Sequence, residues 1–590
     1  MRIQLALLLS LVACQGPATG DEPRRSQPNV ILVMTDDQGW GDLGVHGNTT
    51  LRTPNLDRMA RASARIDPFY VAPVCAPTRA ALMTGRHTQR TRAIDTYVGR
   101  AMLEPEEVTL AERLRDAGYA TGIFGKWHLG DCAPMRPMDQ GFERSLVHRG
   151  GGIGQPSDPE GGERRYTDPR LLDEGVERDF EGYCTDIYFD AAIDWIDQVR
   201  DDRPFFAYVA TNAPHGPFHD VPEDLLAYYQ GLDLPDRVAR VYAMIENIDQ
   251  NVGELFSALD ARGLTDDTLV VFLCDNGPNT ARFNGGLRET KSSVYDGGVR
   301  SPFFAHWPAR LAPRHIEGSP AAHIDLVPTV LAACDVPRPD GLDGVSLLGL
   351  LDGSVAALPE RPIIIQAHRG DYPVRYHHFM VRRGDWKLVH PTGFGRKFDW
   401  ADRARGKSPI TVDYEPELYD LASDPSEQRD VAAANPELVA SLTAVYEEWF
   451  NETGASNPYN YGPTPILLSR EGPSRVVLTR QDWVRSDGRS WGDNGYWTVR
   501  FADDSSWSVR VRFPRGFSPT KVELGINSGV WTWMTHDASV LEEGARDVRI
   551  NGVTHWYTAR PATVACRLFD ASGERGPYQM IWTREPATRR

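Results

Sequence analysis

The stretch Asn29-Val30-Ile31-Leu32-Val33-Met34, followed after Thr35 by the pair Asp36-Asp37, decides the expected fold. A continuous apolar run of this kind predicts a strand that is buried on both faces of a parallel sheet. Open α/β sheets bind their ligands at the carboxyl ends of such strands, where the two aspartates would lie. Asp-Asp-x-Gly is also a common solvated turn, so the pair alone leaves both a ligand site and a turn open.

The same pattern, an apolar run that ends in polar side chains, occurs three more times. Residues 119–124 lead into Gly125-Lys126-Trp127-His128, residues 204–210 lead into Pro214-His215, and residues 268–273 lead into Asp275-Asn276. Helical spacing separates these runs, at residues 54–65, 110–114, 186–199 and 236–262. Strands that alternate with helices over residues 29–350 predict an α/β domain with a large, mainly parallel sheet between two layers of helices.

The later part of the chain changes in style. Short apolar runs at 363–366, 378–381 and 386–389, a run at 417–421 and a helical pattern at 436–449 predict a smaller antiparallel sheet with one helix. From residue 456 the pattern becomes β-rich and sandwich-like. Eight of the fifteen tryptophans follow residue 480 and either fill that core or form a sugar-stacking surface. We therefore expect a catalytic domain at 29–360, a subdomain at 361–455 and a β-rich domain at 456–590.

Residues 150–182 are rich in Gly, Pro and charge and predict a long loop over the sheet. We expect this loop, with His148, Arg149 and His219, to shape the substrate pocket.

The N-terminal residues predict an exported protein. Met1-Arg2 is a short positive start, residues 3–13 are apolar but too short to span a bilayer, and Leu11-Val12-Ala13-Cys14 resembles a bacterial lipobox. We expect residues 1–14 to be a lipoprotein signal peptide, with lipid on Cys14 holding the protein to a membrane, and residues 15–28 to be a tether. The location would be periplasmic or at the outer membrane of a bacterium. A plain secretory signal is the alternative.

The net charge and the cysteine content narrow the range of possible functions. The formal net charge of −17 argues against nucleic acid as a partner, so an anionic substrate would need a local cluster of cations. Seven cysteines cannot form a complete disulfide framework. Five of them are too widely spread to suggest a zinc site, namely Cys132, Cys184, Cys274, Cys334 and Cys566.

The segment Cys75-Ala76-Pro77-Thr78-Arg79 precedes an apolar stretch that predicts a helix. Cys75 would then lie at a helix N-terminus, where unpaired N–H groups favour negative charge, with Arg79 one turn further on. This is a suitable place for attack on an anionic ester. A buried structural thiol is the alternative.

Two kinds of side chain should meet at the carboxyl edge of the sheet. Asp36, Asp37, Asp275 and Asn276 offer only oxygen ligands, which favours Ca²⁺ over Mg²⁺ and argues against zinc. The remaining set can hold an anion because each member is cationic or can become so: Arg79, Lys126, His128, His215 and Lys291.

These motifs, together with Lys291 ahead of Asp296-Gly297-Gly298-Val299-Arg300, resemble those of the formylglycine-dependent sulfatases of the arylsulfatase type. They follow the family's order over about residues 29–450. Thr78 stands where serine is commoner, and Asp296 stands where glutamate is frequent. The resemblance implies an alkaline-phosphatase-like fold and hydrolysis of sulfate esters.

The resemblance also implies roles. Cys75 would be oxidised to formylglycine by a formylglycine-generating or an anaerobic sulfatase-maturating enzyme. Its geminal diol would act as the nucleophile and bind calcium beside the carboxylates. Arg79 and Lys126 would position the diol, His215 and Lys291 would bind the sulfate and protonate the leaving alcohol, and His128 would remove the proton that releases sulfate.

Three points stay open at this stage. The substrate is expected to be a sulfated glycan or an aryl sulfate. Phosphate or phosphonate ester hydrolysis is an alternative within the same superfamily, and a non-catalytic glycan-binding lipoprotein is an alternative of another class.

Overall fold

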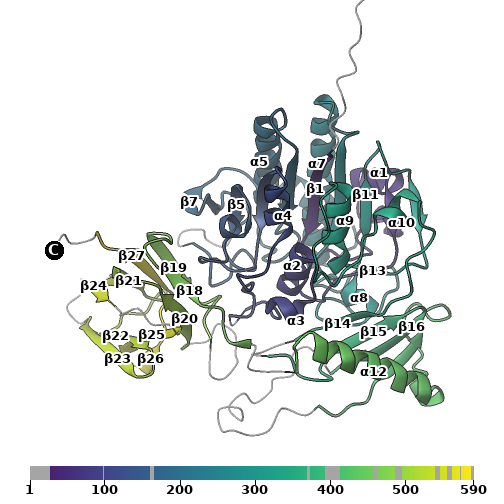
Figure 1. The fold of residues 1–590 in the computed structure, drawn as a ribbon. Coiled ribbons are helices and arrows are strands. Elements are labelled where there is room, and N and C mark those ends of the chain that lie inside the picture. Colours follow the sequence, from purple (N-terminus) through teal and green to yellow (C-terminus); the bar gives the residue numbers. More distant parts are fainter. Residues whose placement is uncertain are drawn as a thin grey trace, which may run out of the picture.

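The computed structural model describes residues 27–586, except residues 98, 160–164, 369–371, 393–411, 457–460, 485–493, 539–544, 555–560 and 572. Its largest part is a ten-stranded sheet in the order β12-β2-β11-β9-β1-β8-β4-β5-β6-β7 (Figure 1). These strands are β1 Asn29–Thr35, β2 Ala64–Ile66, β4 Ala120–Lys126, β5 Arg144–His148, β6 Arg170–Asp173, β7 Val176–Asp179, β8 Phe205–Ala210, β9 Thr268–Cys274, β11 Phe303–His306 and β12 Arg314–Ile316.

The centre of this sheet is parallel, as the sequence predicted. β1 lies between β8 and β9, and β4 lies between β8 and β5, all in parallel register. β11 runs antiparallel to β9, and β6 and β7 extend the other side in antiparallel fashion. Every residue of β1 is buried, because helices cover both faces of the sheet.

Helices pack on the two faces according to the alternation of strand side chains. Val30 and Leu32 of β1 belong to the apolar cluster that contains residues of α2, α4 and α9, whereas Ile31 and Val33 belong to the cluster with α1, α5 and α7. The helices are α1 Pro54–Ala62, α2 Cys75–Thr84, α3 Thr88–Thr91, α4 Leu110–Asp116, α5 Cys184–Val199, α6 Glu223–Gln230, α7 Asp236–Ala261, α8 Asp296–Val299, α9 Leu326–Ala333, α10 Leu348–Asp352 and α12 Pro436–Glu452, with 3₁₀ turns η1 Gly44–His46, η2 Pro137–Gln140, η3 His323–Asp325 and η4 Ala432–Ala434.

Two predictions about local structure were wrong. The helix expected over residues 54–65 ends at Ala62, because residues 64–66 pair with β11 and β12 as β2. The segment 150–182 is not a loop throughout, because it contains the hairpin of β6 and β7 at the edge of the sheet.

A smaller antiparallel sheet follows, in the order β14-β15-β16-β17, with α12 packed on it. Its strands are β14 Ile363–Gln366, β15 Phe379–Arg383, β16 Trp386–His390 and β17 Glu417–Asp420. A three-stranded sheet of β10 Arg300–Ser301, β3 Phe69–Tyr70 and β13 Ala321–Ala322 lies in the larger domain.

The C-terminal part, which we call the β domain, is built from two further sheets (Figure 1, green to yellow). One has the order β18-β20-β25-β22-β23, with β26 paired to β25, and the other has the order β19-β27-β21-β24. Their strands are β18 Ile466–Leu468, β19 Arg475–Thr479, β20 Tyr496–Phe501, β21 Ser506–Arg512, β22 Lys521–Asn527, β23 Trp531–Asp537, β24 Asp547–Thr554, β25 Ala562–Asp570, β26 Gly573–Arg575 and β27 Gln579–Arg584.

The described tryptophans of the β domain divide into two groups. Trp483, Trp497, Trp507 and Trp582 are fully buried in its core. Trp531 is 39% exposed on the edge strand β23, where its ring stacks on Trp533 with centroids 5.0 Å apart. The interpretation that tryptophans fill the core of this domain is therefore correct for the four buried residues.

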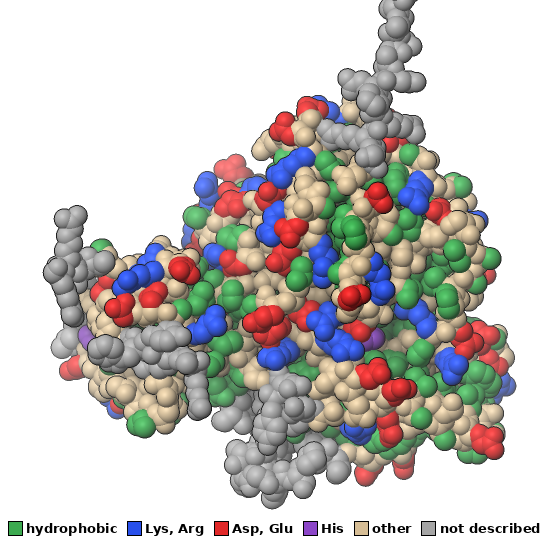
Figure 2. Space-filling model, in the orientation of Figure 1, with side chains coloured by type: hydrophobic (Ala, Val, Ile, Leu, Met, Phe, Trp, Pro, Cys, Tyr) green, Lys and Arg blue, Asp and Glu red, His purple; other side chains and the backbone are tan. Residues whose placement is uncertain are grey.

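The predicted signal peptide and most of the tether lie outside the described residues. Within the described part of the chain, no helix has the length and apolar character needed to cross a membrane. On the face drawn in Figure 2, Lys and Arg side chains are interspersed with Asp and Glu.

Candidate active site

The polar motifs predicted from the strand ends converge at the carboxyl edge of the parallel sheet. Asp36 and Asp37 follow β1, and Asp275 and Asn276 follow β9. The backbone N–H of Asp37 donates to Oδ1 of Asp275 at 3.1 Å, which joins the two strand ends directly. All four side chains are at most 1% exposed.

Cys75 is the first residue of α2, as the sequence predicted, and it is 3% exposed. Every residue of this helix is buried, so its N-terminus is held firmly at the sheet edge. Thr78 directs its hydroxyl to the carbonyl oxygen of Ala72 at 3.0 Å. A serine could donate the same hydrogen bond, so threonine at this position leaves the local structure unchanged.

The donor atoms beside Cys75 fit a divalent cation. Ligand atoms of Asp36, Cys75 and Asp275 all lie within 4.8 Å of one another. Oδ1 of Asp36 and Oδ1 of Asn276 are buried without a hydrogen-bond partner, which is costly unless a ligand satisfies them. The oxygen donors are of the type that Ca²⁺ prefers.

Three cations face these carboxylates, each on a different partner; Arg79 and Lys126 are fully buried and Lys291 is 17% exposed. Arg79, fully buried, donates from Nη2 and Nε to Oδ2 of Asp275 at 2.8 and 3.3 Å, and its Nη1 donates to the carbonyl oxygen of Lys126 at 2.8 Å. Lys126 Nζ donates to Asp36, and Lys291 Nζ donates to Asp37.

Burial and charge compete in setting the ionisation of the carboxylates. Burial raises the pKa of Asp36 to about 6 in spite of Lys126, and burial together with the charge of Asp36 raises the pKa of Asp275 to about 6. Burial also acts on Asp37, but there Lys291 and His215 prevail and hold the pKa below its usual range.

The Cys75 thiol responds to the same charges. Burial would raise its pKa, but the Lys126 and Lys291 ammonium groups outweigh burial and lower the pKa below its usual value. The site therefore stabilises a negative charge at the side chain of residue 75, as an activated nucleophile requires.

Two histidines complete the cluster. His128 Nε2 lies 2.9 Å from the carbonyl oxygen of Thr96, and His215 Nε2 lies 3.8 Å from Oδ2 of Asp37. Burial lowers the pKa of both rings, most strongly that of His128, where Lys126 adds to the effect. Both are therefore neutral at neutral pH and able to exchange protons.

The backbone at this site is strained at three non-glycine residues. Asp37, His128 and Ser292 have φ angles of 66°, 59° and 72°, in the left-handed region that such residues rarely adopt. Strain of this kind persists only where surrounding contacts enforce it, and it is concentrated at functional sites.

Several residues at the site were not found from the sequence. Asn279 donates to Oδ2 of Asp37 at 2.7 Å, and Tyr166 donates its hydroxyl to the carbonyl oxygen of His215 at 2.6 Å. Gly151 lies so close to His128 that an added Cβ would be 2.4 Å from its Cε1 atom. Asn279 lies three residues after Asn276, and Gly151 and Tyr166 lie in the segment 150–182 that was expected to shape the pocket, but the sequence singled out none of these three residues.

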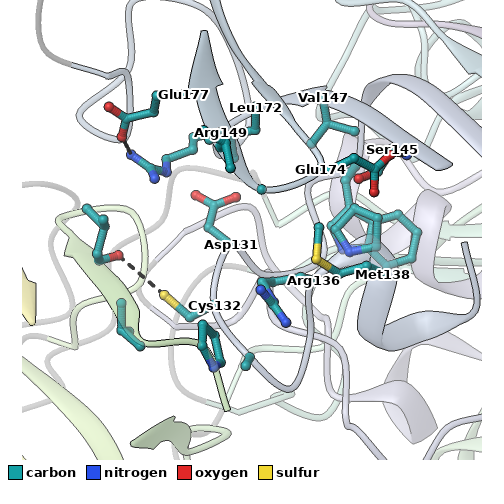
Figure 3. Close-up of a pocket in the computed structure, with 18 of the residues that line it drawn as sticks. Asp131, Cys132, Arg136, Met138, Ser145, Val147, Arg149, Leu172, Glu174 and Glu177 are labelled. Atoms are coloured by element: carbon teal, nitrogen blue, oxygen red, sulfur yellow. Dashed lines mark hydrogen bonds and ion pairs between the residues drawn. The ribbon is translucent and has the colours of Figure 1, made fainter. Parts of the chain in front are cut away.

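A cavity of about 500 Å³ lies between the catalytic domain and the β domain (Figure 3). None of the carboxylates, cations and histidines described above is among the described residues that line it. His148 and Arg149 line it together with residues 473–477 of the β domain, and their role in the substrate pocket stays a prediction. Glu177 binds Arg149 at 2.7 Å and reaches Arg475 across the boundary at 3.6 Å. His219 is exposed and is not among the described residues that line this cavity.

An α/β sheet that gathers a cysteine, carboxylates and buried cations at one edge defines an enzyme for anionic esters. The comparisons with known proteins identify which kind. A family model described as Sulfatase matches residues 28–336, and one described as N-sulphoglucosamine sulphohydrolase, C-terminal, matches residues 289–449. The chain belongs to the sulfatase family, and its reaction is sulfate ester hydrolysis.

Individual relatives agree with this assignment. The chain is 35% identical to human arylsulfatase A over 70% of its own length and 86% of the relative's. It is 28% identical to N-acetylgalactosamine-6-O-sulfatase of Bacteroides thetaiotaomicron over 74% and 96% of the two chains. The crystal structure of Ps i-CgsB in complex with k-i-k-neocarrahexaose superposes with a TM-score of 0.62 at 25% identity, covering 74% of this chain and 94% of the other.

Proposed function

We propose that this sulfatase hydrolyses sulfate esters of a carbohydrate, using formylglycine derived from Cys75 and a bound calcium ion. The observation that carries the proposal is the surroundings of Cys75. Its sulfur lies with oxygens of Asp36 and Asp275 within 4.8 Å, and the charges of Lys126 and Lys291 lower its pKa.

The oxygen-rich side supports cation binding. Asp36, Asp37, Asp275 and Asn276 would hold the calcium ion. Formylglycine and calcium together would supply a nucleophilic oxygen more reactive than a side-chain alcohol. Within this arrangement Arg79 fixes Asp275 and the backbone of Lys126 in place, through the contacts described above.

The cationic side supports binding of the sulfate group. Lys126 and Lys291 offset its negative charge, and groups placed in this way are commonly worth about 3–4 kcal/mol each in the transition state. We assign protonation of the departing alcohol to Lys291 and to His215, whose imidazole would become cationic beside Asp37 once the anionic substrate is bound. We assign proton uptake to Nδ1 of His128, because its Nε2 is held by Thr96.

The test is sulfate release by the purified, matured protein. Cys75→Ala is expected to abolish release, and Cys75→Ser is expected to lose turnover because a plain alcohol would stay sulfated. A peptide mass spectrum of active protein should contain formylglycine at position 75. Full activity of Cys75→Ala, or an unmodified thiol in active protein, would contradict the proposal.

A comparison of matched nitrophenyl sulfate and nitrophenyl phosphate separates this proposal from phosphate ester hydrolysis, because the two leaving groups are identical. Faster turnover of the phosphate would favour the rival activity.

A carbohydrate substrate is supported by the relatives, one of which is named for N-acetylgalactosamine 6-sulfate groups and another of which was crystallised with a neocarrahexaose. A panel of defined sulfated saccharides tests this proposal. Activity confined to aryl sulfates would oppose it.

We further propose export as a lipoprotein through Cys14. Wild-type protein should fractionate with membranes, and Cys14→Ser should be released into the soluble fraction or remain unprocessed. Soluble wild-type protein would instead support a plain secretory signal.

A further inference from the structure

The β domain reaches the catalytic cluster through Gln481, which follows β19 and is 2% exposed. Its Nε2 donates to the carbonyl oxygen of Thr96 at 2.7 Å and lies 3.4 Å from Nε2 of His128. The same carbonyl oxygen lies 2.9 Å from Nε2 of His128. One backbone oxygen is thus shared by the catalytic histidine and by a side chain of the β domain.

Gln481 lies beyond the residues that either family model matches, since the second model ends at residue 449. Its contact with His128 is therefore a property of this chain and its appended domain.

The β domain is docked on the catalytic domain by a continuous core. Met102, Cys132 and Met135 belong to the same apolar cluster as the buried tryptophans of the β domain. Hydrogen bonds between described residues also cross the boundary. They include those from the Cys132 thiol to the Val477 carbonyl at 3.3 Å, from the Leu467 N–H to the Ala133 carbonyl at 2.8 Å, and from the Tyr578 hydroxyl to the Asp158 carbonyl at 3.0 Å. Such packing holds Gln481 in a fixed position, unlike a binding module on a tether.

The shared carbonyl oxygen determines which nitrogen of His128 can act. With Nε2–H donating to Thr96, the other nitrogen, Nδ1, carries no proton. Nδ1 is buried and has no hydrogen-bond partner among the described residues, so it is available to accept a proton. Any movement of the Thr96 carbonyl would release the ring from this tautomer and orientation.

We propose that Gln481 is a positioning residue for His128, and that the β domain is therefore an integral part of the active site. The inference rests on the proposed function, in which Nδ1 of His128 takes up a proton. A glutamine suits this place because its amide donates to Thr96 without bringing a charge to the ring. The charged or titratable groups that act on His128 from the other side include Lys126, Arg79, His215 and His148.

Two substitutions test the proposal in the full-length, matured enzyme. Gln481→Leu removes the donor at similar volume and should lower kcat roughly 10- to 100-fold with a parallel fall in KM, so that kcat/KM changes less than about threefold, because His128 acts in the later step that releases sulfate while sulfate binding and the first step are retained. Gln481→Glu is isosteric and places a carboxylate beside the ring. It should raise the pKa of His128 and move the acidic limb of the kcat profile upward by about one pH unit or more, because kcat includes the step that releases sulfate.

The matched control is Gln579→Leu. Gln579 is 4% exposed in β27, between β19 and β21, so it reports on disturbance of the β domain alone. Thermal unfolding of all variants shows whether each is folded.

The expected result is a loss of kcat in Gln481→Leu and a displaced acidic limb in Gln481→Glu, with neither change in Gln579→Leu. If both Gln481 variants match the Gln579 control, or if the acidic limb of Gln481→Glu stays in place, the inference is overturned. Absence of sulfate release by the wild-type enzyme would instead refute the proposed function, so the two failures are distinguishable.

Discussion

Replacing Lys387 with methionine should loosen the contact between the catalytic domain and the smaller antiparallel sheet. Lys387 lies in β16, and its Nζ is 2.6 Å from Oδ1 of Asp296 and 2.8 Å from Oε1 of Glu427. All three side chains are at most 2% exposed. The backbone N–H of Asp296, at the start of α8, also donates to Oε2 of Glu427 at 2.7 Å.

The magnitude follows from the two carboxylates that the substitution leaves behind. Removing one partner of a buried ion pair commonly costs about 3–5 kcal/mol, because the remaining charge is uncompensated. Burial already raises the pKa of Glu427 in spite of Lys387, whereas Lys387, opposing burial, holds the pKa of Asp296 below its usual range. Without the ammonium group, the pKa of Glu427 should rise further and one carboxyl should take up a proton.

This protonation sets the sign of the pH dependence. A carboxyl whose pKa is higher in the folded state stabilises the fold at low pH and loses that contribution as the pH rises towards its folded pKa. Relative to the wild type, the variant should therefore lose about 1.4 kcal/mol for each pH unit from about pH 5 up to the folded-state pKa of that carboxyl, and no more above it. The loss of stability relative to the wild type should be small at acidic pH and largest at neutral and alkaline pH.

Native-state hydrogen exchange measures the effect locally, which avoids assuming that this multidomain chain unfolds in one step. Amides of β15 and β16 should lose roughly 100- to 5,000-fold in protection at neutral pH, while β1 serves as the internal reference. The matched control is Lys521→Met, because Lys521 pairs with Glu523 at 3.0 Å and is 42% exposed. Such a pair contributes at most about 1 kcal/mol. Equal protection in Lys387→Met and wild type, or a deficit independent of pH, would refute this reasoning.

Three further predictions concern the site and the β domain. Asp275→Asn should abolish the thermal stabilisation that added calcium gives the wild type, which is about 2.7 kcal/mol at a hundredfold excess over Kd. If calcium still raised the calorimetric unfolding temperature of Asp275→Asn as much as that of the wild type, Asp275 would be excluded as a ligand. Gly151→Ala should reduce the rate of sulfate release at least tenfold and leave the unfolding temperature within a few degrees of the wild type, because the added Cβ would press on His128 rather than on the core. Unchanged kinetics would contradict the packing described. Trp531→Ala should change the free energy of unfolding by less than about 1 kcal/mol, and it should weaken retention on immobilised sulfated polysaccharide if the exposed stacked pair binds sugars. Trp582→Ala should lower the free energy of unfolding in urea by about 3–5 kcal/mol, because its side chain is fully buried. Equal losses in the two variants would be inconsistent with their different burial.

The strand ends could be predicted from the sequence because both of their signals are local. An uninterrupted apolar run identifies a buried parallel strand, and the residue after it must lie at the carboxyl edge. Asp36 and Asp275 were placed together on this basis, although they are far apart in the chain. The pairing of β1 with β9 supplies the geometry that makes the argument work.

The hairpin of β6 and β7 escaped prediction for a physical reason. Its strands have four residues each, and β7, Val176-Glu177-Arg178-Asp179, is mostly exposed and charged. Charge on an edge strand prevents association with other sheets, but it also removes the alternation that identifies a strand in the sequence. The composition of such a strand resembles that of a loop.

Contacts between domains could not be predicted from the sequence. The sequence shows Asp296 where sulfatases often have glutamate. Its ion-pair partner Lys387 lies in another sheet, and nothing in the spacing of the two residues predicts their contact. Gln481 likewise follows a strand of the β domain and meets His128 across a boundary that only the docked structure defines. Burial of a polar side chain at such a boundary depends on packing of both surfaces, which no local pattern encodes.

The charges at the catalytic centre explain how a protein with a net charge of −17 can bind a sulfate ester. Three carboxylates, Asp36, Asp37 and Asp275, pair one to one with Lys126, Lys291 and Arg79, so this described set is close to neutral when all six groups are ionised. A divalent cation held by the carboxylates would give the set a net positive charge. It would also compete with the lysines for their carboxylate partners, leaving both ammonium groups free to face an anion. The same pairs would then become an anion site once a cation is bound. The local arrangement, rather than the overall charge, would determine the charge of the substrate.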